Sequence, residues 1–308
     1  MTRRLNILLA LFLLLFGAPY YWLLLENGHG DARAKPLHIA ALRSLAASLP
    51  GQAPSGVEYE VVASRSLPGD LFVAGAGLKR KLVAVMAWRL PVPGGKPILI
   101  DSGLTASDAK SMGMTHFSPA NQARVEQAMD GAGTILVTHE HPDHLGALAA
   151  HGGAALQQAA RLNPAQLPSA PLATRLRWSG PDPRPDPVLS TAAPAALAPG
   201  VVVIPAPSHT PGSQMVYVRL ANGREYLFTG DIATFAQSWI ETRARSRLVG
   251  DWIAPEDRAE VYSWLLTIKA LKQENPRLIV IPGHDFRWIA DEANSVGASE
   301  GFTSARSR

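Results

Sequence analysis

The sequence predicts an α/β protein, because short apolar runs of strand length alternate with segments of helical periodicity. Residues 134–138, 201–204 and 278–281 are compact apolar runs of the kind that form buried strands. Residues 256–272 place their apolar side chains on one helical face. This order of elements suggests sheets covered by helices, and a chain of 308 residues is long enough to bury a sizeable core.

The remaining elements follow from the same patterns. Strands are expected at residues 58–63, 82–90, 97–100, 215–220 and 225–229, and helices at residues 37–49, 119–129 and 153–162. Asn222-Gly223, between the last two of these strands, predicts a hairpin turn. Residues 164–199 are rich in Pro and Ala and predict a surface connection, not a domain boundary.

The N-terminal segment predicts export. Residues 5–25 carry no charge and follow Arg3 and Arg4, and their length matches the roughly 20 residues that cross a membrane. The two arginines predict that the rest of the chain lies outside the cytoplasm, with the periplasm as the expected location. An uncleaved inner-membrane anchor and a cleaved signal segment are both open. The anchor is favoured because the apolar stretch is long for a signal.

These features divide the chain into four parts. Residues 1–35 form the anchor or signal segment with a polar tether, and residues 36–56 form a spacer helix that ends near Pro50-Gly51. Residues 57–293 form the main domain. Residues 294–308 are rich in Gly, Ser and Arg and predict a flexible tail.

Composition limits the classes of partner and of metal site. The formal net charge is +4 and no run of five or more Lys or Arg occurs, so a solvated surface explains the charge and no nucleic-acid partner is expected. The sequence has no cysteine. Any metal must therefore be held by histidines and carboxylates, without thiolates.

Histidines and aspartates follow the predicted strands. His139-Glu140-His141-Pro142-Asp143-His144 comes directly after residues 134–138, and His209, Asp231 and His284 each follow a later strand. In the spacing His-x-His-x-Asp-His, a tight loop places two imidazoles on one metal and turns the Asp and the last His toward a second. Two ions about 3.5 to 4 Å apart need roughly six or seven protein groups, and seven are available here.

Five motifs together resemble the metallo-β-lactamase superfamily, in the family's order, over about residues 57 to 290. The central one, Thr138-His139-Glu140-His141-Pro142-Asp143-His144-Leu145-Gly146, is similar to the family signature. The others are Asp101-Ser102-Gly103, Ser208-His209-Thr210-Pro211-Gly212-Ser213, Thr229-Gly230-Asp231 and Pro282-Gly283-His284-Asp285. The resemblance implies a four-layer αβ/βα sandwich with the metals at one sheet edge, and a catalytic domain over residues 57–293.

The resemblance also implies a ligand set for two zinc ions per chain. By the matching positions, His139, His141 and His209 hold the first ion, Asp143, His144 and His284 hold the second, and Asp231 bridges them. Other divalent metals, such as Mn, Fe and Co, also accept His and Asp ligands. A hydroxide shared by the two ions would attack a carbonyl, and Asp143 would orient the nucleophile and relay a proton as the catalytic residue.

The expected reaction is hydrolysis of an ester, lactone or thioester in a small-molecule substrate. The bridging Asp231 argues against true β-lactamases, and no additional phosphate-binding motif supports a phosphodiesterase. Within the lactonase and glyoxalase II-like branch, acyl-homoserine-lactone lactonases usually carry a tyrosine three residues after the bridging aspartate, where this chain has Thr234. Three alternatives to this reaction class stay open: a phosphodiesterase, a β-lactam hydrolase, and a non-catalytic metal- or ligand-binding envelope protein.

Other polar residues near the motifs receive supporting roles. Asp101 is expected to brace the metal loop, not to bind metal. Glu140 is expected to face solvent or to hydrogen-bond near the ligands, and Asp285 to bond a ligand histidine or to sit in a turn. His116 and His151 are not expected to be ligands.

Overall fold

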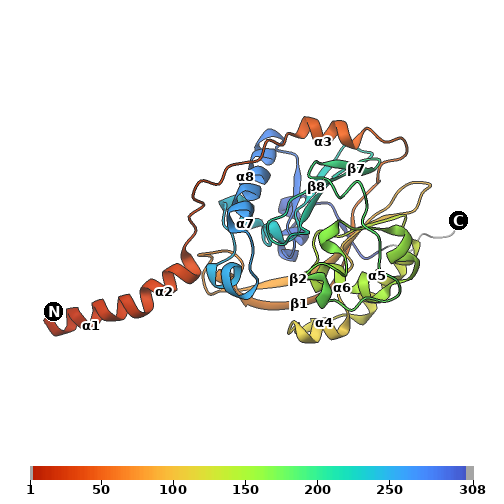
Figure 1. Ribbon diagram of the computed structural model, residues 1–308. Coiled ribbons are helices and arrows are strands. Elements are labelled where there is room, and N and C mark those ends of the chain that lie inside the picture. Colours follow the sequence, from red (N-terminus) through yellow and green to blue (C-terminus); the bar gives the residue numbers. More distant parts are fainter. Residues whose placement is uncertain (1–2, 303–308) are drawn as a thin grey trace.

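Two β-sheets form the centre of the computed structural model, which describes residues 3–302 (Figure 1). The seven-stranded sheet has the order β12-β1-β2-β3-β5-β6, with β4 paired to β1: β1 (Glu58–Pro68), β2 (Arg80–Leu90), β3 (Ile98–Ile100), β4 (His116–Phe117), β5 (Thr134–Leu136), β6 (Ala160–Arg161) and β12 (Ser299–Glu300). The five-stranded sheet has the order β11-β10-β9-β8-β7: β7 (Ala195–Ala198), β8 (Val201–Pro205), β9 (Gln214–Arg219), β10 (Glu225–Phe228) and β11 (Ile279–Ile281).

Helices lie on the outer faces of both sheets. The α-helices of the main body are α3 (Ile39–Ala46), α4 (Ala106–Ser111), α5 (Pro119–Gly131), α6 (Pro142–His151), α7 (Ala236–Glu241), α8 (Arg258–Glu274) and α9 (Phe286–Ala290). Short turns of tighter or wider helix occur at η3 (Gly69–Leu71), η4 (Ala155–Ala159), η5 (Pro164–Gln166), η6 (Ala173–Arg175), η7 (Gly230–Ala233), η8 (Leu248–Ile253) and η9 (Glu292–Asn294). Side-chain caps fix several helix starts; for example, Asp257 accepts the Glu260 amide at the start of α8.

Alternation of side chains along the strands creates the layers. In β8, Val201 and Val203 pack between the sheets, whereas Val202 and Ile204 pack toward α3 and α8. In β5, Leu136 likewise joins the core between the sheets, and Ile135 on the other face packs toward α5 and α6. The two mixed sheets and the helices that cover them are consistent with the sandwich that the resemblance implied.

The predicted elements of the main domain are present, with differences where the pattern was weak. A helix was expected at residues 153–162, but this range contains only the short helical turn η4 followed by the strand β6. The connection 164–199 contributes β7 to the edge of the second sheet, and it buries Gln166 and Leu189. Residues 299–300, expected in a flexible tail, pair in parallel with β1, and Phe302 packs against the first sheet. The last part of that tail, residues 303–308, lies outside the described residues.

One helix projects from the body at the N-terminal end (Figure 1). It runs over 23 residues, Arg3–Leu25, through α1 (Arg3–Phe12), η1 (Leu13–Gly17), α2 (Ala18–Tyr20) and η2 (Tyr21–Leu25). Its length is about 35 Å, which exceeds the roughly 30 Å hydrocarbon core of a bilayer. Its apolar window is not buried against the rest of the chain, and among residues 3–302 no other helix is long and apolar enough to span a membrane.

The spacer helix α3 is held to the second sheet by a buried carboxylate. Glu225, at the start of β10, accepts two hydrogen bonds from Arg43 of α3, at 2.6 and 2.7 Å. The Tyr217 hydroxyl and the Asn275 amide also donate to it. Burial raises the pKa of Glu225, but the hydrogen bonds from Arg43 and Tyr217 outweigh this effect and lower it.

We expect Glu225→Gln to reduce the free energy of unfolding at neutral pH by about 1–3 kcal/mol, because hydrogen bonds to a charged group are lost. The pKa of Glu225 is lower in the folded protein than in the unfolded chain, where it is about 4.3. Its ionised carboxylate therefore stabilises the fold above about pH 4.3, and this stabilisation is lost as the pH falls through the pKa of the folded state. Urea unfolding of both proteins across this range measures the difference. Equal stability at neutral pH would contradict the role given to Glu225.

Candidate metal centre

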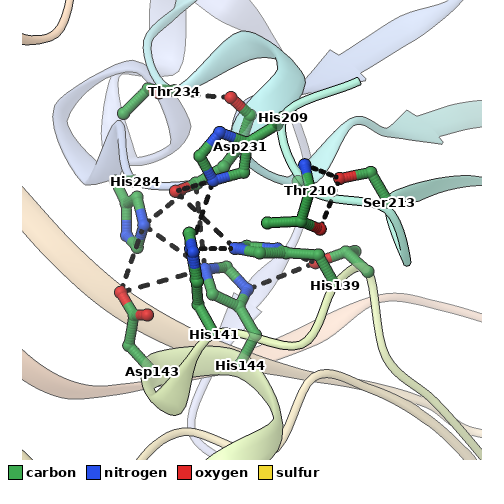
Figure 2. A network of polar contacts seen from close by, with 12 residues as sticks. His139, His141, Asp143, His144, His209, Thr210, Ser213, Asp231, Thr234 and His284 are labelled. Carbon is green, nitrogen blue, oxygen red and sulfur yellow. Dashed lines mark hydrogen bonds and ion pairs between the residues drawn. The ribbon is translucent and has the colours of Figure 1, made fainter. Parts of the chain in front are cut away.

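Loops from both sheets bring the seven predicted ligands to one place (Figure 2). His139 follows β5 of the first sheet, and the loop leads into α6, whose first turn carries Asp143 and His144. His209 follows β8, Asp231 follows β10 and His284 follows β11, all from the second sheet. A loop that ends a buried strand is held rigidly, so side chains at these ends have fixed positions.

The first group consists of His139, His141, His209 and Asp231. His141 Nδ1 lies 3.0 Å from His139 Nε2 and 3.2 Å from His209 Nε2. Asp231 Oδ2 lies 3.9 Å from His139 Nε2 and 3.7 Å from His209 Nε2. Three ring nitrogens and one carboxylate oxygen thus converge on one point, which is the donor set of a tetrahedral zinc site.

The second group consists of Asp143, His144 and His284. Nε2 of His284 lies 3.3 Å from Nε2 of His144 and 3.5 Å from Asp143 Oδ2. The other oxygen of Asp231, Oδ1, lies 3.0 Å from His284 Nε2 and 3.8 Å from His144 Nε2. The carboxylate of Asp231 therefore faces both groups, with one oxygen toward each.

The outward-facing ring nitrogens are held by fixed acceptors. His209 Nδ1 lies 2.9 Å from Glu256 Oε2, His284 Nδ1 lies 2.7 Å from the carbonyl of Ala84, and His144 Nδ1 lies 2.9 Å from Asp101 Oδ2. In each ring Nδ1 donates to its acceptor, so Nε2 faces the centre of the site. Such contacts orient imidazoles for metal binding.

The charges and unsatisfied atoms of the site fit a metal. Burial lowers the pKa of His139 and His209 well below the usual value and that of His141 to about 4, so these rings are neutral. At the second group, burial lowers the pKa of His144, but the carboxylates of Asp101 and Asp143 outweigh it and raise this pKa to about 10. Oδ1 of Asp231 is buried without a hydrogen bond. The neutral imidazoles of the first group and the carboxylates of Asp143 and Asp231 are donors that suit a divalent cation.

Asp101 braces the metal loop, as expected. Its Oδ1 accepts the Thr138 amide at 2.7 Å, and its Oδ2 is the partner of His144. The residue adopts φ = 60°, in the left-handed region that few residues other than glycine occupy. This conformation turns the carboxylate back toward the loop, and the local backbone strain is tolerated at the site.

The structure corrects the expectation that Glu140 faces solvent. Its side chain is buried, with 1% of the residue exposed, and it accepts hydrogen bonds from the Thr210 hydroxyl at 2.7 Å and the Gly212 amide at 3.0 Å. It therefore ties the loop of His139 to the loop of His209. Asp285 accepts the amides of Trp288 and Ala236, which supports the turn interpretation.

Two residues of the site were not predicted. Glu256, the partner of His209, precedes α8, and Arg245 lies in the loop between α7 and η8. Arg245 is buried; its Nη2 lies 2.6 Å from Asp231 Oδ2 and 3.1 Å from the Thr234 hydroxyl. The sequence around Arg245 reads Thr-Arg-Ala-Arg-Ser-Arg and holds no signal that distinguishes it from its neighbours. As expected, His151 lies outside the site, paired with Asp130.

Gly283 makes room for the bridging carboxylate. A Cβ atom at this position would collide with Asp231 Oδ1 and would lie 2.9 Å from the carbonyl oxygen of Gly230. We expect Gly283→Ala to displace Asp231 and to lower the affinity of the site for a divalent metal by at least about tenfold, because groups that orient metal ligands matter this much. Gly131→Ala is the matched control, since a Cβ there meets nothing within 4 Å. Equal metal affinity in the two variants would show that Gly283 has no such role.

The fold and this donor set define a class: an αβ/βα sandwich whose sheet edge carries two adjoining His/Asp groups that could hold metal ions. The family model of the metallo-beta-lactamase superfamily matches residues 84–284, and the chain belongs to this superfamily. The matched residues contain all seven of the converging side chains. No curated protein matches the chain.

Solved structures with the same fold include hydrolases. A quorum-quenching N-acyl homoserine lactone lactonase is 15% identical with a TM-score of 0.58, over 78% of this chain and 96% of that chain. An N-acyl homoserine lactone hydrolase, with the product N-hexanoyl-L-homoserine bound at its catalytic metal center, is 16% identical with a TM-score of 0.57, over 77% and 95%. A probable metal-dependent hydrolase from Staphylococcus aureus is 11% identical with a TM-score of 0.53, over 77% and 91%. At these identities the likeness establishes the fold alone.

Proposed function

We propose that this chain is a metal-dependent hydrolase that binds two divalent ions, with zinc as the first candidate, and cleaves an ester, lactone or thioester bond in a small molecule. The observation that carries the proposal is the position of Asp231. One oxygen faces a group of three histidines and the other faces a second group of two histidines and an aspartate. A carboxylate shared in this way is what holds two ions close together.

The donors divide between the two ions as the sequence motifs suggest. His139, His141 and His209 would hold the first, Asp143, His144 and His284 the second, and Asp231 both. When bound, the ions would acidify a water molecule and polarise the carbonyl of the substrate. The chain's own carboxylate, Asp143, lies at the second group and is the candidate to orient the nucleophile and accept its proton.

The accessible side of the centre is at His141. Of the seven converging residues, His141 is half-buried and the other six are buried. A substrate would therefore approach across the start of α6, where His141 is the N-cap residue. The hydrolases of similar fold that act on lactones support a carbonyl substrate. Thr234 carries no phenol, unlike the tyrosine usual at this position in acyl-homoserine-lactone lactonases, and its hydroxyl accepts a hydrogen bond from Arg245.

We further propose that residues 1–35 anchor the chain in the inner membrane and that the catalytic domain, residues 57–293, faces the periplasm. The unburied helix Arg3–Leu25, which is uncharged over residues 5–25, supports this location, as do the two arginines that precede its uncharged part. Residues 36–56 then form the spacer that contains α3.

A substrate panel on metal-analysed protein tests the proposed reaction. We expect two ions per chain and turnover of a lactone, ester or thioester, with little turnover of a β-lactam or a chromogenic phosphodiester. His139→Ala should remove both metal and activity, whereas His151→Ala, which changes a histidine outside the centre, should leave both unchanged. Preferential phosphodiester or β-lactam turnover would replace the proposed substrate class. Metal-loaded protein without any turnover would point to a binding module.

A further inference from the structure

Large apolar side chains are exposed where the N-terminal helix meets the body. Trp252 is 75% exposed and Ile253 is 67% exposed, both at the end of η8, and Leu78 is 64% exposed in the loop between η3 and β2. Such exposed apolar side chains mark interaction sites when they gather on one face. A tryptophan that leaves most of its ring in contact with water is suited to the polar–apolar boundary of a membrane.

These side chains belong to two loops that pack against each other. The loops are residues 69–79 and residues 242–253. The Ala74 amide donates to the carbonyl of Ala244 at 2.9 Å, and Arg243 donates to the carbonyl of Ala74 at 2.8 Å. The Ser246 hydroxyl donates to the Leu71 carbonyl. We call the surface of these two loops the juxtamembrane face.

The N-terminal helix is fixed to this same face. The Gly75 amide donates to the carbonyl of Leu24 at 2.9 Å, and the Arg247 guanidinium lies 4.2 Å from the centre of the Trp22 ring. Glu26 follows the helix directly and pairs with Arg247 at 2.7 Å. In Figure 1 the helix leaves the body beside these loops. The end of the helix is therefore held in place, not connected through a loose tether.

The charges beside the face also suit phospholipid headgroups. Lys79 and Arg80 are exposed and follow Leu78 directly. The exposed acid closest in sequence to Trp252 is Asp251, which is paired with Arg247 at 3.2 Å. Long cationic side chains can reach phosphate groups while apolar neighbours enter the layer below.

From these observations we propose that the juxtamembrane face docks on the bilayer into which the N-terminal helix inserts, with Leu78, Trp252 and Ile253 at the boundary between headgroups and acyl chains. The inference rests on the proposed anchor. A lipid occupant is favoured because the face surrounds the exit of an apolar helix whose Trp22 is already at the level expected for a membrane interface. The docked face would fix how the metal centre is oriented above the membrane.

Single-cysteine labelling of the full chain tests this docking. The sequence has no cysteine, so Leu78→Cys and Ile253→Cys each provide one site for the fluorophore NBD. Asn222→Cys, at an exposed hairpin between β9 and β10, is the matched control. The proteins are reconstituted in phosphatidylcholine and phosphatidylglycerol vesicles, with and without acyl-chain-brominated lipid. We expect blue-shifted emission at 78 and 253 and severalfold stronger quenching by brominated lipid there than at 222.

Vesicle flotation separates the failure of docking from the failure of the anchor. If the chain floats with the vesicles but labels at 78 and 253 are quenched no more than the label at 222, the anchor stands and docking is overturned. A blue shift without lipid quenching would indicate a protein contact and would also overturn it. If the chain does not float in the absence of detergent, the anchor proposal fails, and docking fails with it.

Discussion

With the proposed hydrolase centre, Asp231→Asn should lower kcat/KM by about a thousandfold or more and reduce the metal content from the proposed two ions per chain to one or none. Asp231 is the only residue among the seven that faces both groups, at 3.7 Å from His209 Nε2 and 3.0 Å from His284 Nε2. An amide of the same shape offers a single oxygen and no negative charge. A thousandfold loss corresponds to about 4 kcal/mol of transition-state stabilisation, which is within the contribution expected of a metal centre.

This effect is measured by metal analysis together with steady-state kinetics on the best substrate of the panel. Asp285→Asn is the matched control, because Asp285 lies two residues beyond Gly283 in the same motif but accepts backbone amides at the starts of α9 and α7. The control should keep both ions and most of the activity. A variant at Asp231 that retained two ions and near-normal kcat/KM would remove the basis for a shared carboxylate.

The candidate ligands could be found from sequence because they lie at or soon after the ends of strands that are themselves visible in sequence. β5, β8, β10 and β11 are short apolar runs, and a polar residue directly after such a run lies at a sheet edge. The bracing role of Asp101 followed from its motif in the same way. By contrast, β6, β7 and β12 contain no β-branched or aromatic residue, and they were missed.

Apart from Asp101, the side chains that contact the candidate ligands could not be predicted, because tertiary packing alone brings them together. Glu256 is 47 residues from His209, and Glu140 is 70 residues from Thr210. The contacts that fix the N-terminal helix have still larger separations, 221 residues for Glu26 and Arg247. Charged residues in polar loops are normally solvated, so the composition of such a loop gives no indication that one of its charges is buried.

Arg245 illustrates how a buried charge can take part in the site without binding a metal. Its guanidinium contacts Asp231 Oδ2 at 2.6 Å and the Thr234 hydroxyl through both Nε and Nη2. Burial opposes the charged form of Asp231, but the contact with His284 and the positive charge of Arg245 outweigh burial and hold the pKa of this carboxyl well below its usual value. Arg245 therefore acts as a positioning residue that keeps the shared carboxylate ionised and in one orientation.

We expect Arg245→Met to destabilise the metal-free protein by about 3 kcal/mol or more, because removing one partner of a buried ion pair leaves the other uncompensated. Metal bound at Asp231 would supply the missing positive charge, so the loss should be smaller in the loaded protein. Metal should accordingly raise the Tm of the variant more than that of the wild type, while kcat/KM falls by about 10–100-fold. Arg243→Met, whose guanidinium contacts Ala74 and the exposed Glu241, is the control. Equal metal-induced shifts in Tm for the wild type and Arg245→Met would mean that the guanidinium only packs beside Asp231 and does not balance its charge.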